Sequence, residues 1–92
     1  MIRSFRDRAT ERFFEGQRVA AFQSFAKQAE RRLVLLDSAE TLGDLAALPS
    51  NRLEALRGDR AGQHSIRINA QWRICFRWTD DGPGDVEIVN YH

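Results

Sequence analysis

The stretch SIRINAQWRICFRW, residues 65–78, alternates between two kinds of side chain along its whole length. Its even-numbered positions are all apolar: Ile66, Ile68, Ala70, Trp72, Ile74, Phe76 and Trp78. Alternation with a period of two is typical of β-structure that buries one face. The odd-numbered positions include Arg67, Arg73 and Arg77. The stretch therefore predicts a sheet with one apolar face and one polar, exposed face that carries three arginines.

This stretch is longer than a typical single strand, and residues 69–71 are the natural place for a turn. A three-residue loop pairs Ile68 with Trp72 and keeps the apolar residues of both arms on one face. The same loop places Arg67 opposite Arg73, and like charges in that arrangement cost a few tenths to about one kcal/mol. Two interpretations stay open. In the first, both side chains extend into water or meet acids. In the second, they bind an anion, because the planar guanidinium group of arginine matches a phosphate.

The other elements are predicted from the same kinds of pattern. Apolar residues at spacings of three and four mark an amphipathic helix over 18–36. In chain order the remaining elements are a strand at 2–5, a helix at 6–14 with Phe13 and Phe14 turned inward, a helical turn at 42–48, a short strand at 53–56, a turn at 80–84 and a last strand at 86–91. This order favours an α+β fold, with a mostly antiparallel, twisted sheet and the N-terminal helices packed on one face.

Composition limits the class of protein. With 92 residues, of which 42% are hydrophobic, the chain is expected to form a single domain over 1–92 with one core. No apolar run reaches the length of a membrane span, and the N-terminus lacks an apolar signal core, so we expect a cytoplasmic protein without a membrane partner. Cys75 is the sole cysteine, which excludes an internal disulfide and argues against a cysteine-based metal site.

The net charge is only +1, but the basic residues are unevenly distributed. Between positions 52 and 77 the chain has six arginines (52, 57, 60, 67, 73 and 77) and two acids, Glu54 and Asp59. One basic segment in a nearly neutral chain is expected of a surface that binds a polyanion.

The chain ends in Tyr91 and His92. Histidine titrates near neutral pH and is the usual proton-transfer group, although a terminal histidine is often only a flexible end. His64 precedes the hairpin and is expected to be structural or exposed. Arginines, a histidine, a tyrosine and Glu54, without a metal ligand set, suggest metal-free cleavage of RNA by its own 2′-hydroxyl, a group that DNA lacks.

Segments 56–69 and 71–76, together with the Tyr91-His92 ending, resemble the HigB-type toxins of the RelE-like superfamily of bacterial toxin–antitoxin systems. The opening residues 1–5 fit as well, so the resemblance covers essentially the whole chain. It implies a microbial-RNase-like sheet flanked by helices. It also implies an endonuclease that cuts mRNA in the ribosomal A site without a metal or another cofactor. The partners it implies are the ribosome, mRNA, a HigA-type antitoxin with a helix-turn-helix domain, and operator DNA bound through that antitoxin.

The resemblance also assigns roles by position. Arg67 and Arg73 would hold or stabilise the scissile phosphate, His92 would transfer a proton, and Tyr91 would position or stack a base. These are the catalytic candidates. The candidates for RNA binding are Arg57, Arg60, Glu54 and Arg77.

Three positions depart from the family pattern. Arg57 stands where relatives often have lysine, and an arginine can only stabilise charge because it stays protonated. Glu54 stands where some relatives have histidine, so it either takes over a base role or has none. Asn90 stands where an aspartate is common, which removes a carboxylate next to Tyr91 and His92.

The residues and the resemblance together lead to one hypothesis and two alternatives. The first is the toxin of a type II toxin–antitoxin system that inhibits growth as a ribosome-dependent mRNA endonuclease. The second is a non-catalytic module that binds RNA or a partner protein through the basic sheet face. A regulatory domain that binds an acidic partner helix is a weaker third.

Overall fold

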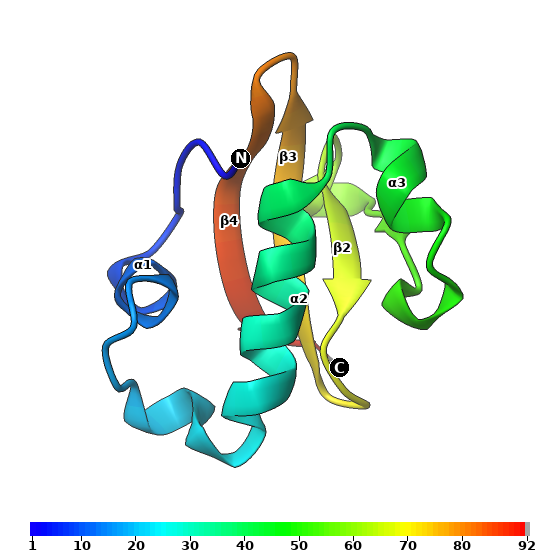
Figure 1. The fold of residues 1–92 in the computed structure, drawn as a ribbon. Helices are drawn as coiled ribbons and strands as arrows, with labels where there is room; N and C mark the ends of the chain where they lie inside the picture. Colours follow the sequence, from blue (N-terminus) through cyan, green and yellow to red (C-terminus); the bar gives the residue numbers. More distant parts are fainter. Residues whose placement is uncertain (92) are drawn as a thin grey trace.

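A four-stranded antiparallel sheet forms the centre of the molecule (Figure 1). The computed structural model describes residues 1–91. The strands are β1 (Glu54–Ala55), β2 (His64–Arg67), β3 (Trp72–Thr79) and β4 (Gly82–Asn90), and they lie side by side in chain order. Every neighbouring pair is antiparallel. The predicted α+β fold with a mostly antiparallel sheet is therefore confirmed.

The helical elements precede the sheet or lie at its β1 edge. They are α1 (Arg8–Phe14), the 3₁₀ helix η1 (Ala20–Phe25), α2 (Ala26–Ser38), α3 (Leu42–Ala46) and the short 3₁₀ turns η2 (Pro49–Asn51) and η3 (Gly58–Arg60). In Figure 1, α2 runs across one face of the sheet, with α1 beside β4 and α3 beyond β2. Among residues 1–91, no helix has both the length and the apolar character that a membrane span requires.

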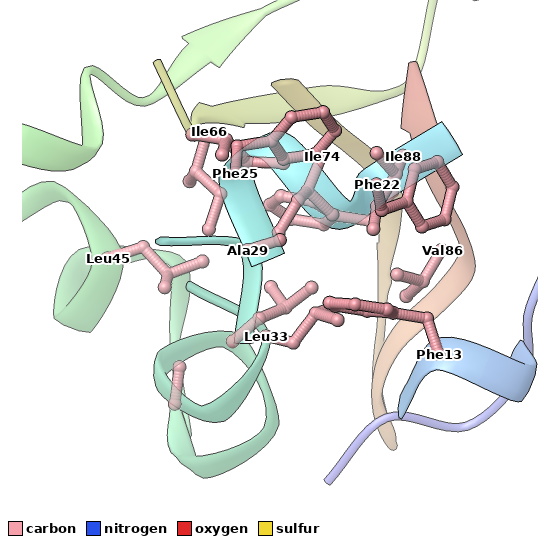
Figure 2. Packing of buried hydrophobic residues seen from close by; sticks show 14 residues of the cluster. Phe13, Phe22, Phe25, Ala29, Leu33, Leu45, Ile66, Ile74, Val86 and Ile88 are labelled. Atoms are coloured by element: carbon pink, nitrogen blue, oxygen red, sulfur yellow. The ribbon is translucent and has the colours of Figure 1, made fainter. Parts of the chain in front are cut away.

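The core lies between α2 and the sheet (Figure 2). Ala29, Leu33 and Leu36 recur at spacings of four and three along α2 and are at most 1% exposed. They belong to one core cluster with Ile66 and Ile74 of the sheet, which are fully buried, and Figure 2 shows Ala29 and Leu33 facing that side of the sheet. Burying one such branched side chain stabilises a fold by about 1.5–3 kcal/mol. This apolar layer fixes the strands and leaves the other face of the sheet for the site.

The hairpin between β2 and β3 has the predicted register. Arg67 lies opposite Arg73. The backbone N–H of Ile68 donates to the carbonyl of Trp72 over 2.9 Å, which closes the loop at the predicted pair. The side chain of Asn69 accepts hydrogen bonds from the backbone N–H groups of residues 71 and 72, both over 2.8 Å. An asparagine that mimics a backbone turn in this way accounts for the position of the fold.

The prediction of one helix over 18–36 is wrong. The helix is interrupted at Phe25, where φ is −131° and ψ is 23°. Phe25 is the last residue of η1, and α2 begins at the next residue. The rings of Phe22 and Phe25 both pack against Trp72, with centroid distances of 6.0 and 4.7 Å. Residues three apart share a face in a 3₁₀ helix, so η1 directs both rings to the same aromatic partner.

Phe14 does not turn inward as predicted. It is 37% exposed, whereas Phe13 is 5% exposed. Consecutive residues of an α-helix project about 100° apart, so only one of the two can face the core squarely. Phe14 instead packs beside Phe5, with ring centroids 5.5 Å apart.

Several strand boundaries also differ from the prediction. The segment at 2–5 forms no full strand, and only Phe5 makes a bridge, parallel to Val86. The strand expected at 53–56 is limited to β1. β4 begins at Gly82, inside the predicted turn, and a register shift between Cys75 and Arg77 lets it continue. Asp85, with φ at 50°, adopts the left-handed conformation typical of such an irregularity.

Candidate active site

The polar face of the sheet is largely buried at its centre, contrary to the prediction of an exposed surface. Ser65 and Cys75 are 0% exposed and Arg73 is 9% exposed. Directly paired residues in adjacent antiparallel strands project to the same face, so Glu54 and Ser65 share this face, as do Arg67 and Arg73. A polar layer therefore covers the side of the sheet that α2 leaves free.

Arg73 is held in place by the chain itself. Its Nε donates to Ser65 Oγ over 2.7 Å, and its Nη2 donates to the carbonyls of Arg52 and Ser65 over 2.6 and 3.4 Å. Arg52 adopts a left-handed conformation, with φ at 45°. A hydrogen bond from a charged donor contributes about 1.5–3 kcal/mol. Arg73 is thus nearly buried, and among residues 1–91 it meets no acid, so neither alternative to anion binding describes it.

Tyr91 lies over the guanidinium of Arg73. The Arg73 Cζ atom is 5.6 Å from the centre of the ring, which permits a cation–π interaction. The Tyr91 hydroxyl donates to Glu54 Oε1 over 3.2 Å. Burial, and then the adjacent Glu54 carboxylate, raise the pKa of Tyr91 above its usual value. The phenol is therefore protonated at neutral pH and remains a hydrogen-bond donor.

Arg67 completes the group that we call the Arg73 cluster: Glu54, Arg67, Arg73 and Tyr91. Its side chain is half-buried, and its Nε donates to the carbonyl of Asn69 over 3.1 Å. Within residues 1–91 it forms no ion pair. The cluster thus combines two guanidinium groups, one phenol and one carboxylate on a rigid sheet.

The remaining candidate residues do not belong to the Arg73 cluster. Arg60 forms an ion pair with Glu87 over 3.1 Å, and Arg77 lies 3.6 Å from Asp85. These two arginines therefore have carboxylate partners and do not join the cluster. Arg57 is exposed just before η3. His92 is a catalytic candidate that falls outside the described residues.

A family profile described as "RelE-like toxin of type II toxin-antitoxin system HigB" matches residues 3–92. The chain belongs to this family. It is 37% identical over 82 residues to Toxin HigB-1 of Vibrio cholerae, covering 87% of this chain and 86% of the relative. It is 34% identical over 92 residues to Endoribonuclease HigB of Proteus vulgaris, covering 99% and 96%.

The fold is also similar to a chain of the YoeB-YefM complex from Staphylococcus aureus. The TM-score is 0.62 at 18% identity, covering 100% of this chain and 98% of the other. At this identity the likeness concerns the fold alone. It confirms the RelE-like architecture expected from the sequence, and membership of a type II system implies a cognate antitoxin for this HigB-family toxin.

Two residues that anchor Arg73 were not foreseen from the sequence of this HigB-family toxin. Ser65 occupies an odd position of the hairpin, and that parity was a usable signal, because it places the hydroxyl on the face of Arg73. Arg52 acts through its backbone carbonyl, and no pattern in the sequence marks its left-handed conformation.

The other reactive side chains of the HigB-family toxin have structural surroundings. Cys75 is fully buried, and burial raises the pKa of its thiol, so the nucleophilic thiolate is disfavoured. His64 stacks on Phe76 with ring centroids 6.2 Å apart, in agreement with a structural role. Within residues 1–91, histidine, cysteine and carboxylate side chains do not gather in any group of three or more that could hold a metal ion.

Proposed function

We propose that this HigB-family toxin is an endoribonuclease that cuts mRNA in the ribosomal A site and thereby inhibits growth. The observation that carries the proposal is the fixed guanidinium of Arg73, between Ser65 and the Tyr91 ring, with Arg67 opposite it and Glu54 beside the phenol. The relative from Proteus vulgaris named Endoribonuclease HigB, 34% identical over nearly the whole chain, supports it.

The reaction proposed is metal-free attack of the 2′-hydroxyl on the adjacent phosphorus. A bond forms between O2′ and phosphorus, and the bond from phosphorus to O5′ breaks. The products are a 2′,3′-cyclic phosphate and a 5′-hydroxyl end. The transition state carries extra negative charge on the phosphoryl oxygens, and preorganised cations stabilise such charge without reorganising during the reaction. Arg73, held by its hydrogen bonds, and Arg67 supply this stabilisation.

The reaction also needs one group that accepts the proton of the 2′-hydroxyl and one that protonates O5′. Glu54 is the carboxylate of the Arg73 cluster and is a candidate base. His92 is the second candidate for proton transfer. Tyr91, whose ring centre lies 5.6 Å from Cζ of Arg73, positions or stacks a base of the RNA. Arg57, Arg60 and Arg77 are proposed to contribute positive charge along the strand.

The partners follow from the same proposal. The ribosome orients the mRNA, because the Arg73 cluster contains one aromatic side chain and offers little stacking surface of its own. A HigA-type antitoxin with a helix-turn-helix domain neutralises the toxin and binds operator DNA with it. The toxin acts in the cytoplasm, where mRNA is translated.

The test is expression of the chain in bacterial cells, followed by primer extension on their mRNA. The parent is expected to arrest growth and to cut within codons, in frame. Arg73→Ala and His92→Ala are expected to lose both effects, while Arg12→Ala, an exposed change on α1, is expected to behave as the parent. Circular dichroism establishes that each variant is folded. If both site variants still arrest growth fully, the catalytic assignment is wrong.

A second candidate function is a module that binds RNA or a partner protein without cleaving RNA. It is favoured by the engagement of Nε and Nη2 of Arg73 within the chain, which leaves fewer donors for a phosphate. Intact message in cells whose growth is arrested would support this candidate, and in-frame cuts would exclude it.

A further inference from the structure

A second basic region lies at the end of β2, next to the Arg73 cluster. It is a hollow of about 370 Å³, and we call it the Arg32 hollow. Its walls come from α2, the η2 turn with the residue after it, and the β2–β3 hairpin: Arg32, Ser50, Arg52, Arg67, Ile68, Asn69 and Ala70. Three of these residues are arginines. Among residues 1–91, the lining contains no carboxylate and no aromatic ring.

Arg32 is fixed at the wall of this hollow. Its Nη1 donates to Asn51 Oδ1 over 2.7 Å and to Ser50 Oγ over 3.3 Å. Asn51 is 1% exposed, and its Nδ2 donates to the carbonyl of Leu45 over 3.1 Å. The guanidinium is therefore positioned by a buried neighbour, which lowers the entropic cost of binding a ligand.

The hollow and the Arg73 cluster share two residues. Arg67 lines the hollow and also lies opposite Arg73 in the sheet. Arg52 is exposed and lines the hollow, while its carbonyl holds Nη2 of Arg73. The two basic regions are thus contiguous around the edge of the sheet, and one extended ligand can contact both.

The charge of the hollow is not compensated within residues 1–91. Arg6, Arg60 and Arg77 all have carboxylate partners, whereas Arg32, Arg52 and Arg67 form no ion pair there. Burial, and then the positive charges of Arg31 and Arg67, lower the pKa of Arg32. An anion placed between these guanidinium groups would relieve that repulsion.

We infer that the Arg32 hollow binds a phosphodiester group of single-stranded RNA, adjacent to the phosphate held by the Arg73 cluster. This inference rests on the proposed function. A phosphate suits the lining because guanidinium groups bind its oxygens with two parallel hydrogen bonds. Continuity with the cluster favours RNA over an acidic peptide, because successive phosphates of one strand can occupy both regions.

The test measures binding of a 2′-O-methyl RNA oligonucleotide, which lacks the attacking hydroxyl, by fluorescence anisotropy over a range of salt concentrations. The variants are Arg32→Gln and Arg52→Gln, which leave the residues of the Arg73 cluster unchanged. Each lost phosphate contact is expected to reduce the slope of log K against log salt by about 0.7. The matched control is Arg8→Gln, which removes one exposed charge on α1, beside β4 at the other edge of the sheet.

The outcomes separate this inference from the proposed function. Weaker binding and a smaller slope in both variants, with the control unchanged, support the hollow as a phosphate site. Parent-like binding in both variants overturns it, even if the parent cleaves mRNA in cells. Weakened binding in the variants, with no mRNA cleavage by the parent, supports the hollow as a phosphate site and contradicts the proposed endonuclease activity. Parent-like RNA binding with loss of affinity for the cognate antitoxin assigns the hollow to an acidic peptide, which also overturns the inference.

Discussion

The two faces of the central sheet are buried to a similar degree, but one is held by apolar contacts and the other by hydrogen bonds. On the face toward α2, Ile66 and Ile74 are 0% exposed and touch other apolar side chains. On the other face, Ser65 is equally buried and Arg73 nearly so, but these side chains are held by hydrogen bonds. Apolar packing tolerates small changes of shape, whereas a buried charge depends on every partner that it has.

This difference links the apolar face to the stability of the domain and the polar face to the proposed chemistry. The core residues on the apolar face are hydrophobic side chains, and their burial favours folding. The polar face holds charged side chains in fixed positions where the ligand is proposed to bind. Substitutions on the two faces should therefore change different properties of the toxin.

The largest expected loss of stability follows a substitution on the apolar face. Phe76→Ala, at a fully buried position, is expected to lower the free energy of unfolding by about 3–5 kcal/mol, through lost burial and the cavity left behind. Ile66→Val, a milder change, is expected to cost about 0.5–1.5 kcal/mol. Urea unfolding measures both. The mRNA cleavage per folded molecule should stay at the parental level in Ile66→Val, and a large loss there would contradict the separation of the two faces.

Ser65→Ala is expected to lower both stability and cleavage, with a loss of stability smaller than that of Phe76→Ala. It leaves Nε of the buried Arg73 without its hydroxyl partner, which costs about 1–3 kcal/mol. Cleavage should also fall, because the guanidinium is less well positioned. Urea unfolding and primer extension measure the two effects, with Ser24→Ala as the exposed control. Equal stability and equal cleavage in Ser65→Ala and the parent would show that this hydrogen bond does not support the site.

The smallest expected effect concerns the ionisation of Tyr91. It is the sole tyrosine, so ultraviolet absorbance of tyrosinate follows it alone. The native pKa should lie above the value in urea, and Glu54→Gln should lower it only partway, since burial is the larger cause. Because the native pKa is raised, Tyr91 contributes its stability in full below the unfolded pKa, and this contribution is lost as the pH rises through the native pKa. Identical native and unfolded titrations would show that the phenol is not in contact with Glu54.

Much of the fold could be predicted because it depends on local patterns. The parity of residues 65–78 was sufficient for the hairpin register, since a shift by one residue would expose every apolar side chain of an arm. The break at Phe25 could not be read from the same rules. The helical spacing of apolar residues continues through that position, whereas the contacts of Phe22 and Phe25 with Trp72 involve a residue remote in the chain.

The candidate site was predicted in part. The pairing of Arg67 with Arg73 follows from the sequence, and Glu54 and Tyr91 were named as candidates although nothing local brings them together. They meet because the phenol of Tyr91 extends across Arg73 to the carboxylate of Glu54. Arg32 was overlooked, because an arginine on the polar side of an amphipathic helix is ordinarily solvated.

The sequence by itself determined which side chains share a face of the sheet, because alternation and an odd loop leave one register that buries the apolar set. It also identified the family, through the hairpin and the Tyr91-His92 ending. The tertiary structure alone decided how the charges on the polar face are used. Arg73 is anchored by Ser65 and a backbone carbonyl, Arg60 is paired with Glu87, and Arg32 stands with Arg67 around a hollow. Those outcomes depend on distances between segments remote in the chain, which no local pattern specifies.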